Sequence, residues 1–178
     1  MTLKDTLSKL STTDPSGEDA KAERERLIGI FKEAISALYN KVESFLEEYT
    51  ASGGLRITKG TTVVEEEHFG RYHAPTMTIF AGSLAVMLVP AGLAVIGARG
   101  RIDMSRQGRP AEDDQIWLLR AAAGTGGEEQ WAITMPPPPG THIGGPRFRP
   151  GAFGPPTRIT KELTKQTFEL CLDHLLKL

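Results

Sequence analysis

Histidines and carboxylates that could do metal or acid–base chemistry lie together in one short segment, EEEHFGRYH. If Gly70 and Arg71 form a two-residue turn, His68 and His73 face each other across a hairpin, with Glu66 on the same face. Two imidazoles and one carboxylate could bind a divalent metal ion, and the same group could act as a general base. This hypothesis depends on the turn, because a shift of one residue separates the two histidines. The alternative is an exposed hairpin whose histidines bind no metal.

Arginines form a second group, because nine arginines and no lysine lie between residues 61 and 158. Arginine binds carboxylate or phosphate through a rigid fork of N–H donors, so these side chains could hold an anion. Within one strand, Arg99 and Arg101 would point to the same face unless Gly100 forms a bulge, and Asp103 would be available for pairing. The alternative is a salt-bridged sheet edge that resists aggregation. The candidate anion-binding residues are Arg99, Arg101, Arg106 and Arg109.

The segment 135–158 (MPPPPGTHIGGPRFRPGAFGPPTR) contains eight of the chain's 12 prolines and no acidic residue. Because proline breaks helices and central strands, the segment predicts a long loop. Its cations and phenylalanines could bind an acidic partner, or a groove that accepts proline and aromatic side chains. The alternative is a crossover that its phenylalanines hold on the protein's own sheet. The candidate partner-binding residues are Pro136, Pro137, Pro138, Pro139, Arg147, Phe148, Arg149, Phe153 and Arg158.

Familiar catalytic signatures are absent from the sequence, including a phosphate-binding loop, a nucleophile elbow and a His-Glu-x-x-His zinc motif. The single cysteine, Cys171, cannot form an internal disulfide and is expected to be a small buried apolar residue. Trp117 and Trp131 lie in strand-like segments and are expected in the core or in an interface. We therefore predict no cofactor.

The elements that position these residues follow from hydrophobic periodicity. Residues 14–51 predict a helix, because apolar side chains recur three and four positions apart along it. That stripe could pack on the protein's own sheet, or on a helical partner or second copy. Leu3, Leu7 and Leu10 suit a short, weakly held helix. The members of the long stripe are Ile28, Phe31, Ile35, Leu38, Val42, Phe45 and Tyr49.

From residue 55 to 134 the period changes to two, and short β-branched runs are separated by glycine. This pattern predicts an antiparallel meander of about six to eight strands, with a two-residue turn at Gly82 and Ser83. The expected strands are 55–58, 62–69, 72–81, 84–89, 93–98, 101–105, 115–122 and 130–134.

The chain closes with a second amphipathic helix, for which Thr164 is the expected cap. Helix, sheet and helix make one α+β domain over residues 1–178. Its expected segments are a weakly ordered stretch (1–13), a helix (14–51), an antiparallel sheet (55–134), a Pro/Gly/Arg-rich loop (135–158) and a C-terminal helix (160–178).

Charge and hydropathy limit the class of partner. The net charge is −1, and the sequence has neither a secretory leader pattern nor a 20-residue apolar run. We therefore expect a cytoplasmic protein of bacterial type that does not bind membranes. Acidic residues 112–114 argue against binding of nucleic acid by the neighbouring arginines.

The leading hypothesis is a non-catalytic accessory subunit that binds a protein partner through the Pro/Arg-rich loop, the N-terminal helix or both. Self-association through that helix is a related possibility. The alternative is a small-ligand or metal-dependent enzyme that uses the Glu66, His68 and His73 hairpin. A nucleic-acid binder that uses the arginine-rich sheet edge is the third hypothesis.

Overall fold

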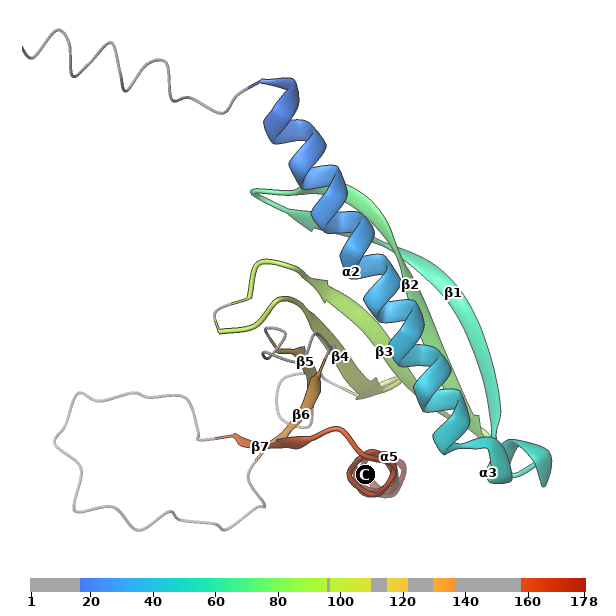
Figure 1. The fold of residues 1–178 in the computed structure, drawn as a ribbon. Helices are drawn as coiled ribbons and strands as arrows, with labels where there is room; N and C mark the ends of the chain where they lie inside the picture. Colours follow the sequence, from blue (N-terminus) through green and yellow to red (C-terminus); the bar gives the residue numbers. More distant parts are fainter. Residues whose placement is uncertain (1–16, 96, 110–114, 122–129, 137–157) are drawn as a thin grey trace, which may run out of the picture.

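A computed structural model describes residues 17–95, 97–109, 115–121, 130–136 and 158–178. The described residues form an α+β fold, in which one seven-stranded antiparallel sheet follows an N-terminal helix along the chain and precedes a C-terminal helix (Figure 1). The helices are α2 (Glu18–Phe45), α3 (Glu47–Ala51) and α5 (Lys165–Lys177). The strands are β1 (Arg56–Glu66), β2 (Gly70–Ala81), β3 (Leu84–Gly92), β4 (Arg101–Arg106), β5 (Ile116–Arg120), β6 (Trp131–Met135) and β7 (Ile159–Glu162).

The sheet is a simple meander, since the strands follow one another in chain order and each pairs antiparallel with the next. The predicted fold class is therefore confirmed. The predicted turn at Gly82 and Ser83 is also confirmed, because Ala81 pairs with Leu84 and Gly82 has a φ of 59°. A positive φ at the first central position alone matches the type II′ geometry that glycine favours.

Helix α2 packs along the sheet through its predicted stripe, of which Phe31, Ile35, Leu38 and Val42 are buried. The expectation that this stripe covers the protein's own sheet is thus confirmed. Tyr39, between these positions, donates from its hydroxyl to the carbonyl oxygens of two strands. Leu46 interrupts the predicted helix, which continues as α3. Residues 14–16 of the predicted helix lie outside the described residues.

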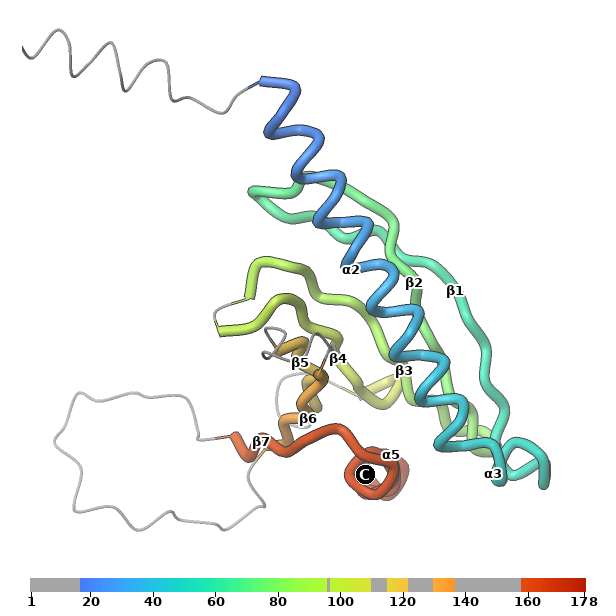
Figure 2. The backbone as a smooth tube through the Cα atoms, in the orientation of Figure 1, coloured from blue at the N-terminus to red at the C-terminus, as the bar shows by residue number. Residues whose placement is uncertain are grey.

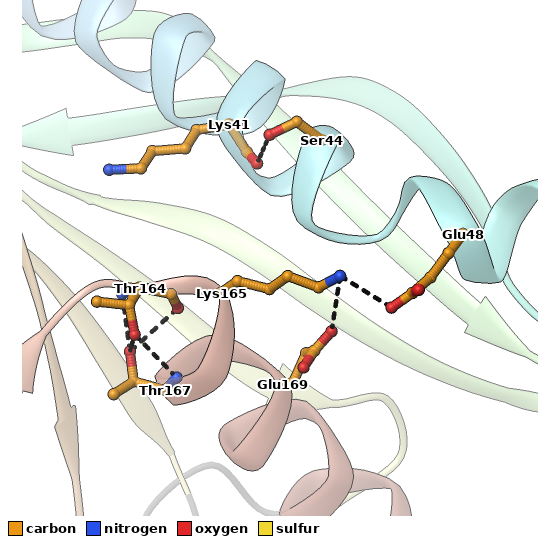
Figure 3. A network of polar contacts seen from close by, with 7 residues as sticks. All are labelled: Lys41, Ser44, Glu48, Thr164, Lys165, Thr167 and Glu169. Carbon is orange, nitrogen blue, oxygen red and sulfur yellow. Dashed lines mark hydrogen bonds and ion pairs between the residues drawn. The ribbon is translucent and has the colours of Figure 1, made fainter.

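The second helix, α5, packs on the same core near the other end of the sheet (Figure 2). Its apolar face is buried and includes Cys171, as predicted. Thr164 forms a capping box with Thr167, which confirms the expected cap (Figure 3). Lys165 then bridges α5 and α3, because its Nζ lies 2.8 Å from Glu48 and 3.8 Å from Glu169 (Figure 3).

Three parts of the predicted sheet are wrong. The strands expected at 55–58 and 62–69 are one continuous strand, β1, since each residue from Arg56 to Glu66 pairs with β2. Residues 93–98 were expected to form a strand, but only an isolated bridge joins Val95 to Ala98. The pairing shifts between Pro90 and Gly92, where the chain leaves β3 through a bulge. Strand β7 was not predicted, because its four residues are all exposed and show no alternation of apolar side chains. Its residues 160–162 were expected to begin the last helix, which instead begins at Lys165.

The core lies between the helices and the sheet face that they cover, called here the inner face. Alternate residues of the central strands point into it and are fully buried, including Met77, Leu88, Met104 and Ile133. No helix within the described ranges combines the length and apolar character that crossing a membrane requires.

Candidate functional site

The opposite, outer face of the sheet carries the most distinctive polar cluster among the described residues. It is centred on Trp117 of β5, which pairs with Asp103 of β4 on one side and Thr134 of β6 on the other. Trp117 alternates with the buried Ile116 and Leu118, so its side chain points away from the core. Trp117 therefore lies outside the core, on the outer face of the sheet.

Two arginines lie against the Trp117 ring. The guanidinium carbon of Arg158 is 3.5 Å from the ring centre, and that of Arg101 is 5.0 Å away. Arg158, just before β7, also donates from Nη1 to the carbonyl oxygen of Gln115 at 2.7 Å. These distances place both cations within the range of cation–π attraction.

Within the described ranges, the carboxylate in contact with this cluster is that of Asp103. Arg101 approaches it with Nε at 2.8 Å from Oδ1 and donates from Nη2 to Oδ2 at 3.2 Å. Both side chains are largely shielded, with 31% of Arg101 and 18% of Asp103 exposed. Burial raises the pKa of Asp103, although Arg101 opposes the shift. Burial, followed by repulsion from Arg101, lowers the pKa of Arg158.

Among the described residues, the charges of this cluster do not balance, since Arg101 and Arg158 share one carboxylate. One positive charge is in excess in a half-buried setting, where screening by water is weaker than at an open surface. We call Arg101, Asp103, Trp117 and Arg158 the Trp117 cluster. Chemically, it can accept an anion.

The four arginines expected to form an anion site do not meet at one place. Arg101 belongs to the Trp117 cluster, whereas Arg106 alternates to the other side of β4. Arg99 is exposed, and its backbone N–H donates to the carbonyl oxygen of Arg120. Arg109 donates to the backbone carbonyl oxygen of Leu178, at the end of α5. Strand alternation and turns therefore separate arginines that are close in sequence.

The hairpin predicted to bring His68 and His73 together has a different register. Glu66 pairs with Gly70, which leaves a three-residue turn that contains His68. His73 pairs with Val63 instead. The predicted two-residue turn is wrong because Gly70, with a φ of 74°, closes the turn from the first position of β2. Across the described ranges, no three His, Cys, Asp or Glu side chains are grouped so that they could hold a metal ion.

Glu66 has a structural role at the end of this hairpin. Its carboxylate accepts hydrogen bonds from the backbone N–H of Leu93, at 2.9 Å, and of Ala94, at 2.7 Å. It also accepts one from the Tyr72 hydroxyl. A Cβ on Gly92 would lie only 2.6 Å from this carboxylate, so the close approach requires glycine. These bonds hold residues 93 and 94 out of the sheet, where a strand was expected.

Most of the predicted partner-binding residues lie outside the described residues: Pro137, Pro138, Pro139, Arg147, Phe148, Arg149 and Phe153. Pro136 is half-buried just after β6, and Arg158 belongs to the Trp117 cluster. Trp131 is 8% exposed in the core, as expected. Trp117 was not predicted as a site residue. Its place among buried residues in the strand run IWLLR was the available signal, because alternation puts it on the outer face.

Comparison with known proteins finds no matching family model, no similar curated protein and no similar solved structure. The functional interpretation therefore depends on the chemistry of the chain's own residues.

Proposed function

We propose that this protein is a non-catalytic accessory protein that binds an acidic segment of a partner protein on the outer face of its sheet. The observation that carries the proposal is the Trp117 cluster, in which two arginines share one carboxylate. An acidic side chain at this place would balance the excess positive charge.

Arg158 is suited to hold such a ligand. Stacking on an indole restrains its guanidinium, so little side-chain freedom is lost on binding. The hydrogen bond to Gln115 uses one N–H of Nη1. A carboxylate needs two parallel N–H donors, and the guanidinium has five, so it can hold Gln115 and a carboxylate together. The preceding segment, 137–157, lies outside the described residues and would add Arg147 and Arg149 on sequence grounds.

A protein ligand fits the cluster better than a nucleic acid does. Binding of single strands uses exposed aromatic faces on which bases stack. The guanidinium of Arg158 lies 3.5 Å from the centre of the Trp117 ring, in the position that a base would take. We therefore favour the carboxylates of a protein segment over the phosphates of a nucleic acid as the anion.

The test is a titration with a short poly-glutamate peptide, followed by fluorescence. Replacing Trp131 by Phe leaves Trp117 as the reporter, because the chain has two tryptophans. We expect saturable quenching that Arg158→Gln weakens about tenfold, or about 1.4 kcal/mol. Arg56→Gln is the matched control, since Arg56 stacks on Phe80 at 4.1 Å but belongs to β1.

Asp103→Asn gives a change of opposite sign, because it removes the competing carboxylate and should tighten peptide binding. Equal effects of the Arg158 and Arg56 variants would contradict the proposal. So would tighter binding of an oligothymidylate than of the peptide, which would favour the nucleic-acid hypothesis.

A further inference from the structure

An apolar pocket between α3 and α5 lies away from the Trp117 cluster. Its volume is about 320 Å³. A cavity of about 150 Å³ holds a benzene molecule, so this pocket has room for roughly two apolar side chains. Tyr49, on its wall, is 39% exposed, which is unusual for a large residue at an apolar site. The apolar lining consists of Leu46, Tyr49, Leu55, Leu172 and Leu176.

The polar part of the pocket is acidic. Glu169 and Asp173 of α5 line it, and Glu48 lies beside it on α3. Lys165 contacts Glu48 and Glu169 (Figure 3). Lys177 pairs with Asp173. Three carboxylates thus face two ammonium groups. The Oε1 of Glu169 is buried and lies 3.8 Å from the Nζ of Lys165. The pocket therefore suits an apolar segment that also carries positive charge.

The first residues of the chain, MTLKDTLSKL, have this character. Leu3, Leu7 and Leu10 are spaced four and three apart, so they share one side if the segment is helical. Lys4 and Lys9 supply the positive charge. We propose that the pocket between α3 and α5 binds residues 1–13 of a second copy of this chain.

A second copy is required because the chain's own segment cannot bring all three leucines to the pocket. Helix α2 has 28 residues, which corresponds to about 42 Å at 1.5 Å per residue. The pocket is lined by residues that follow the C-terminal end of this helix, such as Leu46 and Tyr49, whereas residues 1–13 precede its N-terminal end in the sequence. From Leu7 to Glu18 the chain spans at most about 38 Å when fully extended. Leu7 and Leu10 therefore cannot enter the pocket of their own chain.

Sedimentation of the full chain over a range of concentrations tests this association. We expect reversible self-association that Leu7→Glu weakens at least tenfold. Leu7 is not among the residues that line the pocket, so this variant leaves the pocket lining unchanged. Leu176→Glu, in the pocket, should have the same effect. Leu170→Glu is the matched control, because Leu170 is on α5, is 54% exposed and does not line the pocket.

A labelled peptide of residues 1–13 provides a direct measurement. It should bind the Leu7→Glu chain, and Leu176→Glu in that chain should abolish binding while Leu170→Glu should not. A chain that stays monomeric throughout would overturn the proposal. Self-association that Leu7→Glu leaves unchanged would also overturn it, and would indicate an interface elsewhere. Neither result depends on the Trp117 cluster.

Discussion

At the scale of single residues, the Glu66 carboxylate shows how one side chain redirects a segment. It accepts N–H donors from Leu93 and Ala94 and the hydroxyl of Tyr72. Hydrogen bonds to a charged acceptor are stronger than those between neutral groups. These hydrogen bonds connect the β1–β2 turn to the residues that follow β3. The turn end of the β1–β2 hairpin is therefore held by side-chain hydrogen bonds as well as by strand pairing.

Glu66→Gln should lower the free energy of unfolding by about 1–3 kcal/mol, because the amide loses the charge and its NH₂ group cannot accept a backbone N–H. Urea unfolding followed by circular dichroism measures the change. Glu65→Gln is the control, since Glu65 is the exposed neighbour on β1 and should change stability by less than about 0.5 kcal/mol. Equal losses in the two variants would show that the backbone bonds contribute little.

Gly100 is a second residue whose identity the packing requires. Its φ is 146°, and an added Cβ would lie 2.3 Å from the Phe31 ring. Gly100→Ala should therefore destabilise the protein by about 2–4 kcal/mol through overpacking and backbone strain. Gly29→Ala in α2 should instead stabilise it by about 0.5–1 kcal/mol, because its Cβ would meet nothing within 4 Å. Thermal unfolding of the pair distinguishes these opposite effects, and a tolerated Gly100→Ala would contradict the close contact.

At the scale of elements, α5 depends on a cap that lies directly after β7. Thr164 accepts from the backbone N–H of Thr167, and the Thr167 hydroxyl accepts from that of Thr164. Only Leu163 and Thr164 separate β7 from α5. The capping box at Thr164 therefore determines the residue at which α5 begins. The Lys165 bridge to Glu48 is exposed and contributes less, as surface ion pairs usually do.

Thr164→Ala should cost about 1 kcal/mol of stability, because an N–H at the start of α5 loses its acceptor. Thr164→Ser keeps the hydroxyl and should restore most of the loss. Chemical denaturation of the three proteins under one condition measures the difference. If serine and alanine behave alike, the hydroxyl does not cap the helix.

At the scale of the whole molecule, alkaline pH tests how well the core excludes water. Burial raises the pKa of Tyr39, and burial together with Glu66 raises that of Tyr72. A hydrogen bond to Glu169 raises the pKa of Tyr49. These are the chain's three tyrosines. The pKa of each tyrosine is higher in the folded protein than in the unfolded chain, where it is about 10. The neutral phenols therefore contribute fully to the free energy of unfolding below about pH 10, and this contribution is lost as the pH rises further.

We therefore expect little tyrosinate in the folded protein at about pH 10, followed by ionisation together with unfolding at higher pH. Absorbance at 295 nm and circular dichroism, measured on the same samples, should change in parallel. Complete ionisation near pH 10 with an unchanged fold would contradict the burial of Tyr39 and Tyr72.

The sequence by itself determined the fold class, the buried stripe of α2, the turn at Gly82 and the cap at Thr164. Each depends on local geometry: side-chain periods of 3.6 and 2, a positive φ, or a hydroxyl near free backbone N–H groups. Each of these features is specified by residues that are close together in the sequence. They also predicted Cys171 in the core, where burial raises its pKa to about 11.

Only the tertiary structure decided the hairpin register, strand β7 and the meeting of Arg101, Trp117 and Arg158. Register depends on which backbone groups pair, and Gly70 fits either turn length in sequence. Strand β7 gains its hydrogen bonds from β6, and its exposed side chains carry no periodic signal. The Trp117 cluster joins β4, β5 and the residue before β7, which are far apart in sequence and meet on one face of the sheet. Such contacts are a property of the assembled sheet, because no local pattern specifies which outward-facing side chains become neighbours.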